Sequence, residues 1–300
     1  MKISQRHWLM LALTATVLWS LSKIILKLGL EVVPPMLLAG MAQTVAFVAL
    51  LIYSFWHPIK LTRKFTNPEI HSLVWLGVLG FVLAPLLAII GLTSVTGATA
   101  GLFASLSPLL VMLFGWVILR EKLTSFQLLG MLVAFGGAYV FLSQNQFSGT
   151  NFGILLIVIS EICYALNVAL TRLIMRRPGD DALLVSLGGT FLGMIILLPL
   201  GLSQDGISSL GSGSAWLVIL SVGLIFAMGG LLWTGALNEL RAFEAAVLQN
   251  TMLIQVGLLS ALILGERFGW GQILGGIIVL AGAYLVNREL INHKSQHVRR

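Results

Sequence analysis

One acidic side chain, Glu161, stands near the middle of a long apolar run between residues 153 and 173. At about 1.5 Å of rise per residue, it would lie roughly 12 Å from the end of a membrane helix. A carboxylate at that depth costs about 3 kcal/mol to insert, so it should face the protein interior and hold a partner or a proton. A carboxyl group that takes up and releases a proton beside a ligand can couple the ligand's movement to protons. Glu161 is therefore our candidate for proton coupling.

A basic side chain, Lys23, lies at a similar depth in another apolar run, residues 8 to 28. It could contact an anionic group of a ligand, form a structural pair with Glu161, or extend its amine to the membrane surface. Lys27 follows one helical turn later, at the end of the run, where the surface is within reach. The three interpretations of Lys23 stay open.

Uncharged polar side chains extend this pattern. Glu161, Tyr164 and Asn167 are spaced by three residues, which places them on one stripe of an otherwise apolar helix. Polar residues of other runs could complete a cavity, and an aromatic ring could stack on a substrate there. The alternative for each polar residue is an interhelical hydrogen bond worth about 0.6 kcal/mol, and for the ring a place in the packed core. The candidate substrate-binding residues are Trp19, Lys23, Gln43, Tyr164, Asn167, Gln249 and Asn250.

Prolines interrupt three apolar runs, as Pro85, Pro108 and Pro199. Because proline has no backbone N–H, each should kink or locally unwind its helix and free carbonyl groups. Pro108, directly after Ser107, is our candidate hinge.

Helices must position these residues. Of the 300 residues, 58% are hydrophobic and only 10% are charged, which does not suit a water-exposed surface. A bilayer core needs about 20 apolar residues per helix, and the alternation typical of a barrel is missing. The fold class is therefore an all-α integral membrane protein with ten transmembrane helices. The expected spans are 8–28, 36–56, 72–92, 97–118, 127–143, 153–173, 182–202, 215–235, 243–263 and 271–287.

Basic residues set the orientation of these spans. With a cytoplasmic N-terminus, 15 of the 18 Lys and Arg residues fall in cytoplasmic segments. Arg267 alone falls in an outer loop, while Lys23 and Lys27 belong to the first span. This bias predicts that both termini are cytoplasmic.

An internal repeat is the most specific pattern in the chain. It aligns two segments at an offset of 145 residues, EKLTSFQLLGMLVAFGGAYV (121–140) and ERFGWGQILGGIIVLAGAYL (266–285). Aligned identical pairs are Glu121 and Glu266, Gln127 and Gln272, Gly130 and Gly275, and Gly137 and Gly282. The same offset carries Trp19 onto Tyr164 and Lys27 onto Arg172. We expect both glutamates to stabilise the start of the next helix.

Each copy then holds five helices, residues 1–145 and 146–290, before a basic cytoplasmic tail at 291–300. Because five is odd, the second copy enters the membrane from the opposite side, which makes the halves inverted repeats. Two such halves can rock about a site between them and expose it alternately to each side.

In this arrangement the chain resembles the drug/metabolite transporter superfamily, EamA type, over its whole length. The local match comprises Ser107-Pro108, the apolar run that ends at Glu121 and the glycine-rich helix that follows. The second copy departs from it, since Leu253 stands where Pro108 would fall. The resemblance implies a secondary transporter, an exporter or exchanger of amino acids, metabolites or drugs in a bacterial inner (plasma) membrane. It also implies that the fourth, fifth, ninth and tenth helices form paired scaffolds.

The sequence lacks the residues that other classes of function need. The five histidines lie in termini or loops, and the sequence has neither an HExxH pattern nor a Walker-type loop. Cys163 is the single cysteine, so a disulfide within the chain is impossible. We therefore expect no cofactor, no metal and no enzymatic activity, although a passive channel, or less favourably an intramembrane enzyme, stays an alternative. The net charge of +7 lies in short clusters between spans, which favours a small-molecule substrate and the lipid bilayer as partners over nucleic acid.

Overall fold

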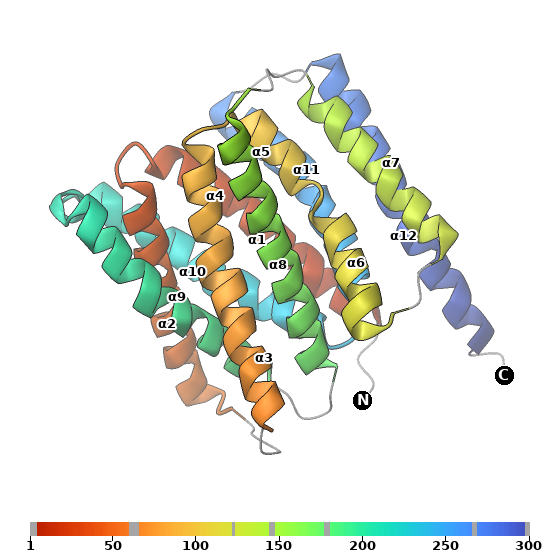
Figure 1. The fold of residues 1–300 in the computed structure, drawn as a ribbon, viewed down its shortest axis with the longest axis horizontal. Coiled ribbons are helices and arrows are strands. Elements are labelled where there is room, and N and C mark those ends of the chain that lie inside the picture. The colour runs from red at the N-terminus through yellow and green to blue at the C-terminus, as the bar shows by residue number, and fades with distance from the viewer. Residues whose placement is uncertain are drawn as a thin grey trace.

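A computed structural model describes residues 5–59, 66–121, 124–143, 148–176, 181–265 and 269–297. These residues form a bundle of helices, with no strand among them beyond an isolated bridge between Val95 and Gly149 (Figure 1). The helices of the first part are α1 (Gln5–Gly29), α2 (Pro35–Trp56), α3 (Asn67–Gly77), a π-helical turn (Val78–Leu83), α4 (Ala84–Leu92), α5 (Gly97–Ala104), α6 (Ser107–Leu119) and α7 (Ser125–Leu142). The remaining helices are α8 (Asn151–Met175), α9 (Ala182–Asp205), a 3₁₀ turn (Ser208–Gly211), α10 (Gly213–Ala236), α11 (Ala242–Leu264) and α12 (Trp270–His297).

Helix lengths agree with a protein that crosses a membrane several times. Within the described residues, eight helical segments are long and apolar enough to span a bilayer. Two of these combine shorter elements, namely Ile70–Leu92 and Thr99–Leu119. The helices α11 and α12 contribute shorter apolar stretches, Thr251–Ile263 and Trp270–Leu285. The all-α membrane class is confirmed, and the count of ten spans stays a prediction.

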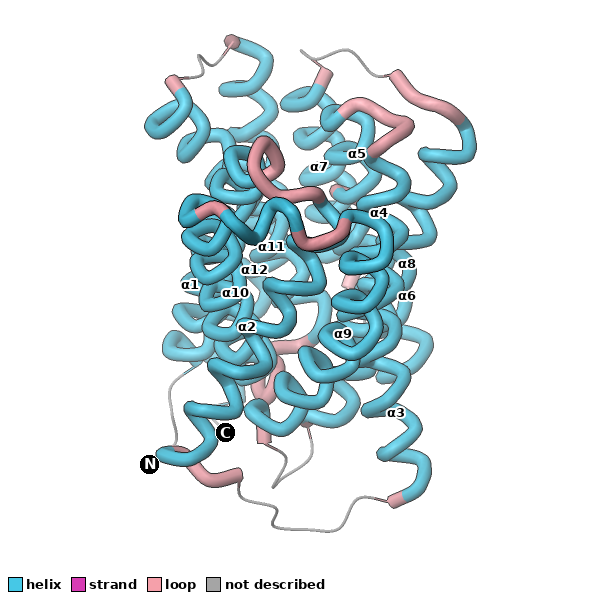
Figure 2. Tube along the Cα trace, turned by 90° about the vertical axis from the view of Figure 1, so that its left-hand side faces the viewer, coloured by secondary structure: helices cyan, strands magenta, loops and turns pink. Residues whose placement is uncertain are grey.

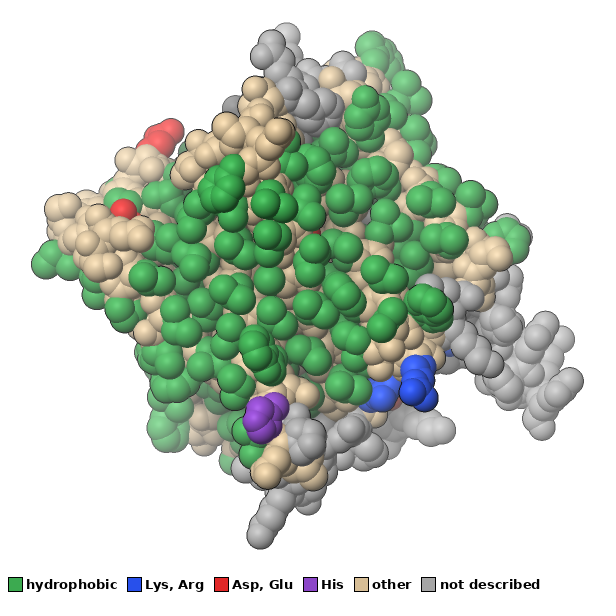
Figure 3. Space-filling model, viewed as in Figure 1, with side chains coloured by type: hydrophobic (Ala, Val, Ile, Leu, Met, Phe, Trp, Pro, Cys, Tyr) green, Lys and Arg blue, Asp and Glu red, His purple; other side chains and the backbone are tan. Residues whose placement is uncertain are grey.

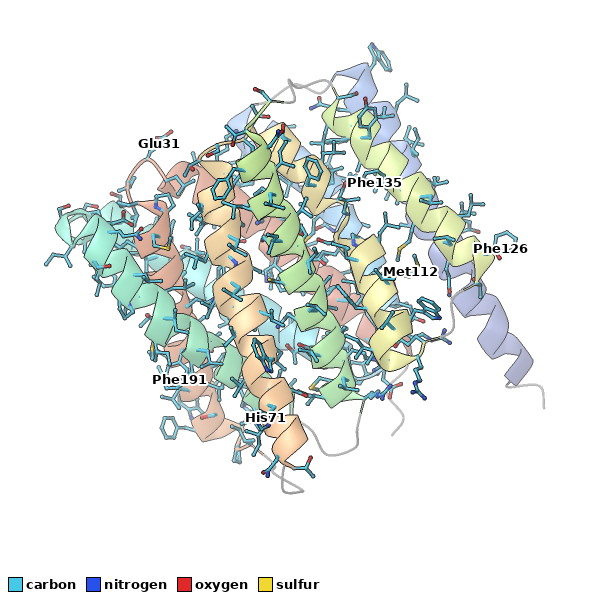
Figure 4. The ribbon with its side chains drawn as sticks, in the orientation of Figure 1. Glu31, His71, Met112, Phe126, Phe135 and Phe191 are labelled. Atoms are coloured by element: carbon cyan, nitrogen blue, oxygen red, sulfur yellow. The ribbon has the colours of Figure 1, made fainter. Side chains whose placement is uncertain are left out.

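The surface is apolar where a bilayer would surround it. Hydrophobic side chains cover most of the face in Figure 3, and the charged side chains in view lie at its edges. Figure 4 shows Phe126 and Phe191 at the periphery of the bundle, and they are 58% and 43% exposed. Large exposed apolar side chains on so many helices suit lipid and not water. Both described ends of the chain lie at the same end of the bundle (Figure 2).

The helices α7 and α12 pack along each other on glycines (Figure 1). A Cβ atom added to Gly282 would lie 2.5 Å from the carbonyl oxygen of Gly130, and one on Gly137 would lie 2.9 Å from that of Gly275. Such distances leave no space for a side chain, so the backbones approach directly. The glycines aligned by the repeat thus meet crosswise, each with the non-equivalent glycine of the other helix.

Equivalent glutamines begin these two helices. Gln127 Oε1 accepts a hydrogen bond from the backbone N–H of Thr124 at 2.9 Å, and Gln272 Oε1 accepts one from Gly269 at the same distance. The repeated glutamine therefore satisfies an N-terminal backbone donor in both copies. The carboxylate of Glu121 pairs with Arg172 of α8, with Oε1 3.8 Å from Nε. The expectation that both glutamates stabilise the start of the next helix stays a prediction, and Glu266 lies outside the described residues.

The three prolines have different effects. The π-helical turn comes directly before Pro85, whose missing N–H leaves the carbonyl of Phe81 without its usual partner. The chain unwinds at Ser105 and Leu106, and α6 restarts with Ser107 and Pro108 in its first turn. By contrast, α9 continues through Pro199.

The helix α11, where Leu253 replaces proline, also runs without a break from Ala242 to Leu264. The unwound turn before Pro108 thus has no equivalent in α11. At the other end of the chain, α12 extends to His297, into the segment expected to be a separate tail.

Candidate functional site

The centre of the candidate site is a contact between α6 and α8. The hydroxyl of Ser107 donates a hydrogen bond to Oε2 of Glu161. Ser107 is 6% exposed and is the first residue of α6, so the unwound turn before it delivers the hydroxyl to the acid. A charged group so deep in an apolar bundle needs such a donor.

Lys23 approaches the same acid from α1. Its side chain is exposed, although Lys23 stands within a long apolar helix. Its charge interacts electrostatically with Glu161. Among the described residues, however, no ion pair within 4 Å joins them. Lys23 therefore keeps its amine available for a further contact.

Tyr164 lies one turn below Glu161 on α8, at the contact with α11. Its hydroxyl accepts a hydrogen bond from Nε2 of Gln249 at 2.7 Å. The other amide atom, Oε1 of Gln249, is buried and has no hydrogen-bond partner. A buried acceptor without a donor is costly, and a ligand donor would satisfy it.

Asn167, the third residue of the stripe, has a different partner. Its Nδ2 donates to the carbonyl oxygen of Leu76 at 2.7 Å, directly before the π-helical turn. A Cβ atom on Gly80 would lie 2.3 Å from the Asn167 side chain, so only glycine fits there. Asn167 thus holds the irregular turn, which supports a positioning role and not substrate contact.

The ring of Trp19 packs against that of Trp233 on α10. Their centroids are 5.2 Å apart and the rings are inclined by 52°, a favourable aromatic geometry. Gly229 makes room for it, because a Cβ atom there would lie 2.7 Å from Nε1 of Trp19. Trp19 is only half-buried, so part of the ring still faces open space.

The remaining candidates lie elsewhere or outside the described side chains. Gln43 lies between α2 and α9 against Gly193, and its Oε1 is buried without a hydrogen-bond partner. No described hydrogen bond connects Gln43 to the Glu161 contact. Asn250 belongs to α11, but its side chain lies outside the described part of the structure.

Sequence reasoning missed a second polar contact, between α1 and α11. Ser20 Oγ donates to Gln255 Oε1 at 2.8 Å, and Gln255 Nε2 donates to Thr16 Oγ1 at 3.2 Å and to Thr251 Oγ1 at 3.0 Å. The available signal was the i, i+4 spacing of polar residues on both runs. The repeat offset also aligns Thr16 with Glu161, so the two polar contacts occupy equivalent places.

The site contains no metal-ligand cluster within the described residues. A separate cavity of about 770 Å³ opens where α1 and α9 begin and α2 and α10 end. Aromatic residues such as Trp8, Tyr53 and Trp56 line it. None of the candidate site residues lines it. The candidate site is therefore separate from this cavity.

A family model for EamA-like transporters matches the chain twice, over residues 6–143 and 151–288. The chain belongs to the EamA-like transporter family. The expected resemblance is thus confirmed; the first match ends and the second begins close to residue 145, where the predicted halves meet.

Relatives of this EamA-like protein are also named as transporters. An uncharacterized transporter of Archaeoglobus fulgidus is 24% identical over 287 residues, covering 95% of this chain and 99% of the relative. The uncharacterized transporter YetK of Bacillus subtilis is 25% identical, with 88% and 82% covered. A probable amino-acid metabolite efflux pump of Salmonella typhimurium is 25% identical, with 92% and 93% covered. A solved protein crystal structure shares the fold, with a TM-score of 0.80 at 21% identity over 96% of this chain and 99% of the other.

Proposed function

We propose that the protein is a secondary transporter that moves a small organic metabolite by alternating access. The observation that carries the proposal is the polar site at Glu161. Helices of both expected halves meet there, since α1 and α6 belong to the first and α8 and α11 to the second. A site between two halves can face either side of a membrane as the halves rock.

The charges of this site favour a substrate with both an amine and a carboxylate. Lys23 offers a cation for a carboxylate, while Glu161 and Oε1 of Gln249 offer acceptors for an amine. The relative named a probable amino-acid metabolite efflux pump supports amino acids as the class and export as the direction. Glu161 would exchange a proton during the cycle.

The proposal includes an arrangement in the membrane. The halves, residues 1–145 and 146–290, would be inverted repeats with both termini in the cytoplasm. The two family matches, the crosswise glycine contacts of α7 and α12 and the equivalent helix-starting glutamines support this duplication. The bacterial and archaeal relatives favour the plasma membrane.

Counterflow in vesicles tests the proposal. The purified protein is reconstituted into liposomes loaded with one unlabelled amino acid at a time, and the uptake of the same labelled compound is followed. A carrier accumulates label transiently above equilibrium and saturates, whereas a passive channel, the alternative function, only equilibrates it. Because Glu161 is the proposed site, Glu161→Ala should abolish counterflow. Equilibration without accumulation for every amino acid that enters would contradict a carrier.

A further inference from the structure

The largest hydrophobic cluster of the described residues fills only one end of the central helices. It joins α1, α6, α8, α10 and α11 at the end of the bundle where both described ends of the chain lie, and it includes Leu76 of α3 and Val185 of α9. Its fully buried members include Ala12, Val111, Ala165 and Ala245, each 0% exposed. Trp19 and Tyr164 pack against this cluster, so buried side chains close one side of the candidate site.

Among the described side chains, the opposite end of these helices has no such cluster. The four remaining clusters join α2 with α9 or α10, or α6 with α7 and α12. None of these described clusters joins α1, α6, α8 and α11 beyond the site, and Lys23 is accessible there. With the largest cluster on one side and no equivalent cluster among the described residues on the other, the site has the form expected of one state of an alternating-access carrier.

One residue of α8, Arg172, closes the sealed end. Its Nη1 donates hydrogen bonds to the carbonyl oxygens of Leu237 and Asn238, the latter at 2.6 Å. Its Nε lies 3.8 Å from Oε1 of Glu121, at the end of α6. A single side chain thus ties the end of α6, in the first half, to the turn between α10 and α11, in the second.

The contact of Arg172 is strong enough to hold the two halves together but is not fully satisfied. Arginine bound to carbonyls and to a carboxylate is among the stronger polar contacts in proteins. However, Nε of Arg172 is buried without a hydrogen-bond partner, since 3.8 Å is too long for one. The contact is therefore incomplete, and breaking it costs less than breaking a fully satisfied pair.

We propose that Arg172 is the latch of the cytoplasmic gate and that this structure represents the state closed to the cytoplasm. The inference rests on the proposed transport function and orientation. Release of Arg172 from Leu237, Asn238 and Glu121 would let the end of α6 separate from the α10–α11 turn. The cluster beneath Trp19 and Tyr164 could then part and open the site.

Cysteine accessibility tests the latch without any substrate. In a Cys163→Ala background, Val111→Cys places one thiol inside the sealed cluster. Inside-out membrane vesicles are treated with a membrane-impermeant maleimide, and the labelling rate is measured. Adding Arg172→Gln should raise that rate about fivefold or more, the usual size of a coupling between a contact and a conformational equilibrium.

Arg241→Gln is the matched control, because it removes the same charge at the same end. Arg241 is 45% exposed and pairs with Glu244 of its own helix, so its loss should change labelling less than about twofold. If Arg172→Gln does not fold, Arg172→Lys retains the charge without the planar fork and should also raise labelling. An unchanged rate in the folded variant would overturn the latch. Such a result would leave the transport proposal intact, whereas failure of counterflow would not alter the labelling result.

Discussion

At the residue scale, the three members of the polar stripe on α8 each meet a different helix. Glu161 meets Ser107 of α6, Tyr164 meets Gln249 of α11, and Asn167 meets the carbonyl of Leu76 on α3. The stripe therefore has a charged residue, Glu161, at one end and a structural residue, Asn167, at the other. Between them, the partner of Tyr164 keeps an unpaired acceptor. Only Glu161 and the contact of Tyr164 are suited to bind a ligand and a proton.

Proton coupling predicts a specific effect of Glu161→Gln. The amide keeps the shape and can still hydrogen-bond Ser107, but it cannot bind and release a proton at physiological pH. We expect substrate exchange to remain detectable while its pH dependence between about pH 5 and 8 disappears. Counterflow measured across that range checks this. Flux that is still driven by a proton gradient would rule out the role.

Lys23 and Glu161 should also be coupled in stability. Neutralising either residue leaves the other charge in the bundle without its opposite, so Lys23→Met and Glu161→Gln should each destabilise the protein. Thermal unfolding in detergent of both single variants and the double variant measures the coupling. We expect the double loss to be smaller than the sum by about 0.5 kcal/mol or more. Strictly additive losses would argue that the two charges act independently.

At the element scale, close backbone contact joins α7 to α12, as it also joins α2 to α9. The glycines of the repeat meet crosswise between α7 and α12, and Met112 of α6 packs beside the pair with Met131 and Ala283 (Figure 4). This pairing agrees with the scaffold role implied for the fifth and tenth helices. A rigid scaffold leaves the central helices as the parts that move.

Two adjacent glycines allow a controlled test of this packing. A Cβ atom on Gly275 would lie 2.3 Å from the backbone nitrogen of Phe141, whereas the nearest atom to one on Gly276 is 3.7 Å away. Gly275→Ala should therefore destabilise the protein by about 1–3 kcal/mol through overpacking. Gly276→Ala should be neutral or stabilising by up to about 1 kcal/mol, because alanine favours the helix. Thermal unfolding of the two variants compares them, and equal effects would contradict the contact.

At the scale of the whole molecule, the described ends of the chain lie at the same end of the bundle (Figure 2), and the contact of Ser107 with Glu161 joins the two predicted halves. The predicted inverted halves would give the two sides of the membrane similar but unequal packing. In this structure the side of the termini is the packed one. The orientation of the chain in the membrane therefore decides whether the packed end of the bundle lies on the cytoplasmic or the outer side, and so which compartment the site faces.

Labelling of two loop positions tests the orientation. Ser148 and Glu239 are exposed and lie in turns at opposite ends of the bundle according to the predicted topology. In the Cys163→Ala background, Ser148→Cys should react with an impermeant maleimide on intact cells. Glu239→Cys should react only in inside-out vesicles. The reverse pattern would place the termini outside.

The sequence alone determined the class of the molecule and the repeat. Apolar runs of fixed length can only be membrane helices, because lipid offers no partner to a free backbone group. The sequence also made Glu161, Lys23 and the stripe residues candidates, because charged and amide side chains in such runs are rare. The local resemblance predicted the family, which the comparisons confirmed.

Only the tertiary structure decided which polar residues meet. Ser107 reaches Glu161 because the helix unwinds before it, and Gln249 reaches Tyr164 from a distant helix. Glu121 pairs with Arg172 of a distant helix, and Asn167 bonds to the backbone beside a π-helical turn that no spacing rule indicates. Spacing along a chain fixes the face of a helix that a residue occupies. The partner across the contact depends on how helices far apart in sequence are packed, and that is a property of the whole bundle.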